Sequence, residues 1–171
     1  MLGAARTVNE LLDHIQEGRE LYERRAWREA YQVFLRADDV SPLGSDDLER
    51  LATAAYLIGR DLEFQQLIER LHRIHVEAGD AERAARCTFW LALSFLFRGD
   101  VGQANAWTAR GHRLVQDRDC VERGYLLLPA AEQQLHGGNA VAAHATASDA
   151  VAIGAGPARD RGRETRWALL V

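Results

Sequence analysis

The feature that most constrains the fold is a set of turn signals that recur at nearly fixed spacing along the chain. Gly59, Gly99 and Gly138 each follow an apolar segment and are separated by 40 and 39 residues, and position 25 precedes Gly59 by 34 residues. Glycine readily adopts the left-handed conformation that closes a helix. Self-similarity at such a period is the signature of a repeat architecture. The spacing therefore predicts about four helix hairpins in succession.

Small and aromatic residues within the first hairpin can be given steric roles. We expect Gly18 and Ala30 where two helices cross closely, Phe34 in the space between hairpins, and Pro42 at the end of the second helix. Apolar residues recur three and four apart in the later segments, and strand-like alternation is absent. The pattern predicts an all-α fold built as a helical repeat array. The corresponding residues of the later hairpins are Ala52, Ala55, Tyr56, Phe64 and Leu71; Leu91, Ala92, Phe95, Ala104 and Trp107; and Leu127, Leu128, Ala131, Ala143, Ala147 and Ala150.

Capping residues and spacing place the helix starts and the connections. Ser45 or Asp46 is predicted as one N-cap, with Glu49 completing a capping box, and Asp80 as another. Spacings longer than 34 residues predict extra residues in the linkers near Ala78–Asp80 and Asp117–Asp119.

Several segments resemble a known family. AWREAYQVFLRADDVSP, residues 26–42, matches the tetratricopeptide pattern at its Ala, Phe, Ala and Pro positions. Together with DLERLATAAYLIGRD, AGDAERAARCTFWLALSFLFRGD and CVERGYLLLPAA, it resembles the tetratricopeptide-like region of actinobacterial LuxR-type transcriptional regulators, over roughly residues 17–153. The resemblance implies a tetratricopeptide-like array with a right-handed superhelix in residues 1–153. An irregular tail or a short capping helix is expected in residues 154–171.

In that family a C-terminal helix-turn-helix binds DNA. Nothing after Gly154 has the pattern of a recognition helix. We therefore expect a truncated or isolated regulator domain that does not itself bind nucleic acid. Because repeat arrays need their ends covered, a homodimer through the open end of the array is also predicted.

The resemblance also implies where a partner binds. First helices of tetratricopeptide pairs line a concave groove, against which a protein or peptide would lie. Arg19 and Arg86 are expected to pair with a carboxylate of a peptide or a small acid. The alternative, that aromatic residues pack between repeats, is favoured for Phe89 and Phe97 and stays open for the tyrosines. The predicted groove residues are Arg19, Tyr22, Glu49, Tyr56, Arg86, Phe89, Tyr125, Glu132 and His136.

Two functions fit these expectations. The first is a non-enzymatic interaction module that binds a protein or peptide partner in a transcription-related regulatory pathway. The alternative is a domain that senses a small effector within a LuxR-type regulator. A closed apolar cavity would favour the small effector, and an open channel would favour a peptide.

Patterns for catalysis or metal binding are weak. Glu69, His72 and His75 stand three residues apart, but a di-iron site needs a second Glu-x-x-His motif and further carboxylates. His72 and His75 are therefore expected on the surface. Cys87 lies in an apolar segment, which favours a packing role over that of a nucleophile. We predict no enzymatic activity, no catalytic residue, no cofactor and no metal site.

Charge and cysteine content indicate which partners and which cellular location to expect. The net charge of −4 gives no general attraction to nucleic acid or anionic lipid. No apolar stretch is long enough to cross a bilayer, so no membrane partner is expected. The distant Cys87 and Cys120 fit a reducing compartment, and a cytoplasmic location is predicted. All 21 basic residues are arginine, which together with abundant alanine indicates a GC-rich, actinobacterial source.

Overall fold

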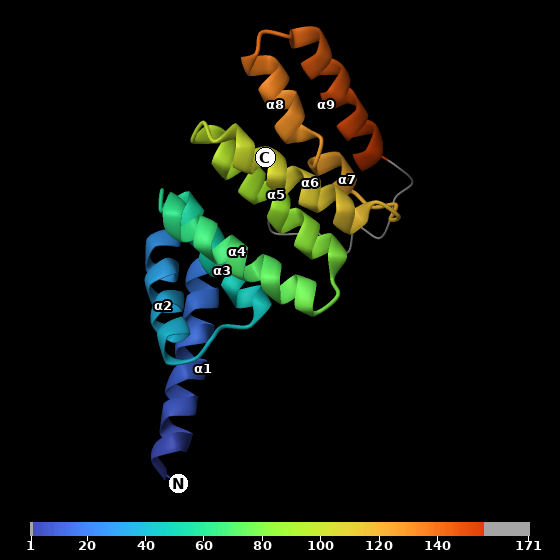
Figure 1. The fold of residues 1–171 in the computed structure, drawn as a ribbon. Coiled ribbons are helices and arrows are strands. Elements are labelled where there is room, and N and C mark those ends of the chain that lie inside the picture. The colour runs from blue at the N-terminus through green and yellow to red at the C-terminus, as the bar shows by residue number, and fades with distance from the viewer. Residues whose placement is uncertain (1, 156–171) are drawn as a thin grey trace. The chain divides into compact units, whose positions relative to one another are not determined.

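Helices dominate the part of the chain that the computed structural model describes, which is the backbone of residues 2–155 with the side chains of residues 12–155. Residues 2–155 contain no strand, so the all-α prediction is confirmed. The helices, labelled in Figure 1, are α1 (Leu2–Glu23), α2 (Trp27–Val40), α3 (Ser45–Leu57), α4 (Asp61–Glu77), α5 (Ala81–Phe97), α6 (Val101–Val115), α7 (Glu122–Tyr125), α8 (Leu128–His136) and α9 (Ala140–Gly154).

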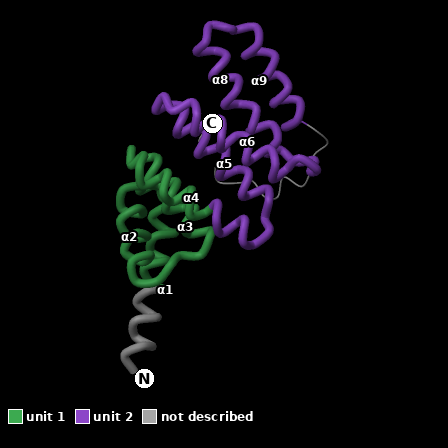
Figure 2. Tube along the Cα trace, viewed as in Figure 1, with its two compact units in different colours: residues 1–71 green, residues 72–171 purple. Residues whose placement is uncertain are grey.

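The chain divides into two compact units, Met1–Leu71 and His72–Val171 (Figure 2). In the first unit α1 pairs with α2, and in the second α5 pairs with α6 and α8 with α9. Helix α4 begins in the first unit and ends in the second. Packing between consecutive helices confirms the predicted helical repeat array. Of the tail predicted for residues 154–171, Gly154 ends α9, and residues 156–171 lie outside the described part.

The core of the first unit forms where a small residue meets a large one. Phe34 of α2 is fully buried, and a Cβ atom at Gly18 of α1 would lie 2.9 Å from its ring. Packed interiors do not accept so short a contact, so glycine is what lets the two helices approach. The predicted role of Gly18 is confirmed, and Phe34 packs against α1 within the first hairpin, so its predicted place between hairpins stays a prediction. The other large side chains that are fully buried in this unit are Leu48, Leu51, Phe64, Ile68 and Leu71.

The second unit has a comparable close approach. A Cβ atom at Gly111 of α6 would overlap Thr88 of α5 and Leu126. Thr88 is itself fully buried, and its hydroxyl donates to the carbonyl of Ala85 at 2.6 Å. Because Gly111 has no side chain, α6 can approach Thr88 of α5 closely and leave room for the side chain of Leu126. The remaining large buried side chains here include Phe89, Leu91 and Val115.

Five tight turns in the chain share one hydrogen-bond pattern. The central residue has a positive φ, and its N–H donates to the carbonyl three residues back. The next N–H donates to the carbonyl five residues back, which completes a Schellman motif. In three of these turns that next residue also caps the following helix through its side chain: Asp80, Asp100 and Asn139. The five central residues are Arg25, Gly59, Gly79, Gly99 and Gly138.

One of these turns corrects the predicted linker at Ala78–Asp80. Gly79 forms the same tight turn as the hairpins do, so no long linker separates α4 from α5. The extra residues lie instead within the helices, because α4 and α5 have 17 residues each, against 14 in α2 and 13 in α3. The second predicted linker, Asp117–Asp119, does lie between helices α6 and α7.

The first helix of the fourth hairpin is broken, which the repeat pattern did not predict. Its residues form a short α7 and a separate α8, and Pro129 lies in the first turn of α8. Proline has no N–H to donate to a carbonyl of the preceding turn, so a continuous helix through this position would lose a hydrogen bond. Leu126 and Leu127 form the bend between the two pieces.

Candidate partner-binding site

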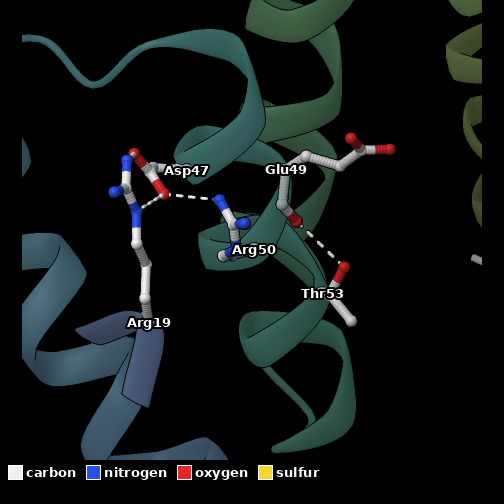
Figure 3. Close-up of polar contacts among 5 residues, drawn as sticks. All are labelled: Arg19, Asp47, Glu49, Arg50 and Thr53. Atoms are coloured by element: carbon white, nitrogen blue, oxygen red, sulfur yellow. Dashed lines mark hydrogen bonds and ion pairs between the residues drawn. The ribbon is translucent and has the colours of Figure 1, made fainter. Parts of the chain in front are cut away.

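A cluster of charged side chains joins α1 to α3 in the first unit (Figure 3). Arg19 donates from Nε to Oδ1 of Asp47 at 2.9 Å and from Nη2 to Oδ2 at 2.7 Å. Arg50 donates from Nη1 to the same Oδ1 at 2.6 Å. Two guanidinium groups thus share one carboxylate, and the negative charge of Asp46 also acts on Arg19.

Local structure explains why these groups meet. Asp47 lies in the first turn of α3, where the helix dipole favours a negative charge. Arg50 follows three residues later on the same helix face. Arg19 reaches this carboxylate from α1, through the paired hydrogen bonds that a planar guanidinium makes well.

The cluster holds the carboxylate in its charged form. Burial of Asp47 acts to raise its pKa, but the hydrogen bonds and positive charges of Arg19 and Arg50 outweigh that effect and leave the pKa below its usual value. The hydrogen bond to Asp47 in turn raises the pKa of Arg19, against an opposing effect of burial. Asp47 is only 6% exposed, whereas the side chain of Arg19 is 45% exposed. The accessible part of the cluster is therefore an arginine.

The rest of the α3 face is mixed. In Figure 3 the carboxylate of Glu49 points away from Asp47, and the hydroxyl of Thr53 donates to the main-chain carbonyl of Glu49 at 2.9 Å. Tyr56 is half-buried, with its ring 5.0 Å from that of Phe64. Glu49 and Tyr56 therefore remain candidates for contact with a partner.

The position of Tyr22 decides whether this tyrosine packs inside the array or faces the groove, which the sequence left open. It is buried, and its ring meets that of Trp27 edge-on at 5.1 Å, across the turn between α1 and α2. It packs inside the first hairpin and is not an exposed groove residue.

Arg86, predicted to pair with a ligand carboxylate, is instead paired within the second unit. It donates from Nη2 to Oε1 of Glu122 on α7, and Glu122 is only 2% exposed. A buried carboxylate needs such a partner, because an isolated charge is costly away from water. The predicted role of Arg86 in binding a ligand is therefore corrected to one in holding α7 against α5.

Phe89 and Phe97, both expected to pack between repeats, differ in their burial. Phe89 is buried between Trp90, at 5.0 Å, and Tyr125, on which it stacks at 5.5 Å. It follows the alternative of packing inside the array. Phe97, for which the same alternative was favoured, is 65% exposed at the end of α5. Tyr125 is half-buried against Phe89.

The last two predicted residues lie on α8. His136 Nδ1 lies 3.4 Å from Oε1 of Glu132 and 3.0 Å from its main-chain oxygen. His136 is exposed and Glu132 half-buried. These contacts join neighbouring turns of one helix, and none of the described contacts links them to Arg86 or Phe89.

The histidines of the Glu69-x2-His72-x2-His75 pattern are not on the surface, and that prediction is wrong. His72 is 8% exposed and His75 is 6% exposed. The ring of His72 meets that of Trp107 on α6 edge-on at 5.2 Å. Helical periodicity could not reveal that Trp107 of α6 lies against His72. Among the side chains of residues 12–155, no three His, Cys, Asp or Glu residues gather in a way that would hold a metal ion.

Sequence reasoning missed Asp47, Arg50 and Glu122. The three-residue spacing of Asp47 and Arg50 on a predicted helix was a usable signal. No local signal existed for Arg19 with Asp47 or for Arg86 with Glu122, because these partners are 28 and 36 residues apart in sequence.

The sequence matches no known family model and none of the curated proteins. None of the described helices has both the length and the apolar character that a membrane crossing needs.

Proposed function

We propose that this chain is a non-enzymatic interaction module that binds a protein or peptide partner. Support comes from the helical repeat architecture, since helical repeat proteins commonly use the faces of successive helices to bind partners. The observation that carries the proposal is the Arg19–Asp47–Arg50 cluster, which places a half-exposed arginine on helices that the repeat pattern assigns to the binding face.

The chemistry of the cluster favours a partner that carries carboxylates. The side chain of Arg19 is 45% exposed, so an incoming anion can reach a positively charged group beside the buried Asp47. Arginine is well suited to this role because its planar group binds carboxylates through paired hydrogen bonds and is weakly hydrated. Tyr56 on the same helix adds a rigid ring of the kind that anchors interfaces.

The regulatory setting of this proposal rests on the resemblance to LuxR-type regulators. In that setting the partner would be a protein or peptide of a transcription-related pathway. A small acidic effector is the alternative, and the same arginine chemistry would recognise it.

An array of short peptides with free carboxylates tests the proposal. Each Asp- or Glu-containing peptide is paired with a copy that carries Asn or Gln, and binding of the labelled chain is compared between Arg19→Ala and the unchanged protein. We expect acid-dependent binding that falls about tenfold in Arg19→Ala, since a hydrogen bond to a charged group contributes roughly 1.5–3 kcal/mol. Competition by free glutamate or succinate would indicate the small-effector alternative.

Arg60→Ala is the matched control. Arg60 forms an exposed ion pair with Glu63 in the same unit, with 56% of its side chain exposed. Its loss removes an equal charge without touching Asp47, so binding should stay within about twofold. Equal binding by the Arg19→Ala, Arg60→Ala and unchanged proteins, with all three folded by circular dichroism, would rule the cluster out as the binding site.

A further inference from the structure

The buried face of α4 near its C-terminal end holds a group of basic and aromatic side chains. The ring of His72 meets Trp107 of α6 edge-on at 5.2 Å, with an angle of 81° between the ring planes. The guanidinium carbon of Arg110 lies 4.3 Å from the centre of the Trp107 ring. Trp107 therefore contacts a histidine from one helix and a cation from its own helix. All of these residues belong to the second unit.

This surrounding suits a neutral histidine and not a charged one. His72 is 92% buried, with Nε2 lacking a hydrogen-bond partner among the described residues. The charged groups that act on its titration are both basic, Arg110 from α6 and His75 from α4. Burial first, and then these two neighbours, lower the pKa of His72 below its usual 6.5.

We infer that the His72–Trp107 contact is a pH-sensitive joint, which holds the C-terminal end of α4 against α6 at neutral pH and releases it when His72 takes up a proton. Protonation would place a positive charge on a ring that is shielded from water and lacks a counter-ion in the part of the chain that the structure describes, near the guanidinium group of Arg110. The released histidine is solvated and its charge is screened.

The direction of the effect follows from linkage. A histidine whose pKa is lowered in the closed form binds a proton more readily in the open form, so acid favours opening. The contact is fully present above the ordinary pKa of 6.5 and weakens as the pH falls below it. The contact itself lies within the second unit, on the C-terminal part of α4.

Fluorine NMR on the full chain, labelled with 5-fluorotryptophan, reads this contact directly. Four tryptophans give four signals, and Trp107 is assigned by elimination with Trp27→Phe, Trp90→Phe and Trp167→Phe. Between about pH 8 and about pH 5 we expect the Trp107 signal to shift toward the solvent-exposed position. Hydrogen exchange within residues 72–77 and 101–115, corrected for the intrinsic effect of pH, should rise about tenfold for each unit by which the pKa of His72 is lowered.

His72→Gln keeps the size and polarity of the site without a titrating ring, and it should abolish both pH responses while remaining folded. Two controls keep their histidine at position 72. His144→Gln removes an exposed histidine of α9. His112→Gln removes an exposed histidine of α6, the helix that carries Trp107, and the pKa of His112 is also lowered, by desolvation and by Arg123. Both should retain the response at Trp107. The inference is overturned if His72→Gln keeps the acid-induced shift, or if the Trp107 signal stays constant while the unchanged protein is acidified.

Discussion

The carboxylate of Asp47 is the residue on which the α1–α3 contact in the first unit depends, because it accepts hydrogen bonds from both Arg19 and Arg50. Replacing it with Asn leaves two guanidinium groups without their counter-ion. Removing one partner of a fully buried pair costs about 3–5 kcal/mol, whereas exposed pairs contribute much less. Since Asp47 is buried but Arg19 is half-exposed, we expect Asp47→Asn to lower the free energy of unfolding by about 2 kcal/mol.

Urea unfolding measures this loss, and Asp39→Asn, at an exposed position of α2, serves as the control, with an expected change within about 0.5 kcal/mol. The pH dependence supplies a second check. Because the pKa of Asp47 lies below its ordinary value of 3.8, its contribution is complete above that pH and is lost as the pH falls through the folded pKa. Asp47→Asn should lack this acid-dependent step. Equal stabilities of the two variants would show that the cluster adds nothing to folding.

Glu122 should be less tolerant of change than Asp47, since it is 2% exposed and its partner Arg86 is 13% exposed. Glu122→Gln leaves a guanidinium buried without a counter-charge, and we expect a loss of about 3 kcal/mol in a thermal or urea melt. Glu82→Gln is the comparison, because Glu82 is half-exposed and lies 3.9 Å from Arg118. That change should cost under about 0.5 kcal/mol. A similar loss in both variants would contradict the assigned role of burial.

The partners of individual charged side chains were predicted less well from the sequence than the helices were. Arg19 and Arg86 were predicted to pair with a carboxylate of a ligand, whereas each pairs in the structure with a carboxylate of its own unit. Which acid a buried arginine meets depends on how helices about thirty residues apart in sequence pack. Periodicity indicates which face of a helix is buried, and it carries no information on what lies opposite that face.

At the scale of elements, the five turns offer an internal comparison, because four have glycine at the position of positive φ and one has Arg25. A side chain in this conformation costs roughly 1–2 kcal/mol. The Gly59 site has no atom within 4 Å of where a Cβ would lie, so only backbone strain opposes a substitution there. We predict that Gly59→Ala destabilises the chain by about 1 kcal/mol and that Arg25→Gly stabilises it by about 0.5–1 kcal/mol.

Denaturant midpoints of the two variants, measured with unchanged slope, check this prediction. Gly154→Ala is a suitable control, because Gly154 ends α9 without a positive φ and its Cβ site is also empty. If Arg25→Gly were destabilising, the side chain of Arg25 would have to contribute more than the strain it causes.

Helix ends show why the sequence predicted some elements and missed others. Gly59, Gly99 and Gly138 were placed in turns because positive φ selects glycine, and Asp80 caps α5 as predicted. The expected cap at Ser45 or Asp46 is wrong, since α3 begins at Ser45 with Gly44 as its N-cap and without a side-chain cap. Several capping residues in a row leave the starting point undetermined.

The break between α7 and α8 is a different kind of miss. The repeat pattern predicts one continuous helix through Pro129. Proline has no N–H to continue the hydrogen bonds of that helix, and the structure has a break there instead. The break has a role in packing, because Leu126 at the bend is fully buried and lies beside Gly111 of α6. A long-range contact of this kind cannot be read from the hairpin period.

At the scale of the whole molecule, a repeat array is stabilised by each hairpin and by its contacts with the next one, without a single shared core. The two compact units fit this description, with Phe34 at the centre of the first and Phe89 in the second. Opening can then occur in one part of such a chain while another stays closed. The Asp47 and Glu122 clusters provide one local probe for each unit.

Hydrogen exchange in Asp47→Asn and Glu122→Gln should therefore respond in different places. A loss of about 2 kcal/mol corresponds to roughly a thirtyfold rise in exchange, which we expect in residues 12–57 for Asp47→Asn, with residues 81–150 within about twofold of the unchanged protein. Glu122→Gln should give the opposite pattern, and α4 should respond to both because its residues contribute to both units. Asp39→Asn and Glu82→Gln should leave both regions unchanged. If either cluster variant raised exchange equally along the whole chain, the two units would unfold as one, and the stability of this array would have to be treated as that of a single cooperative domain.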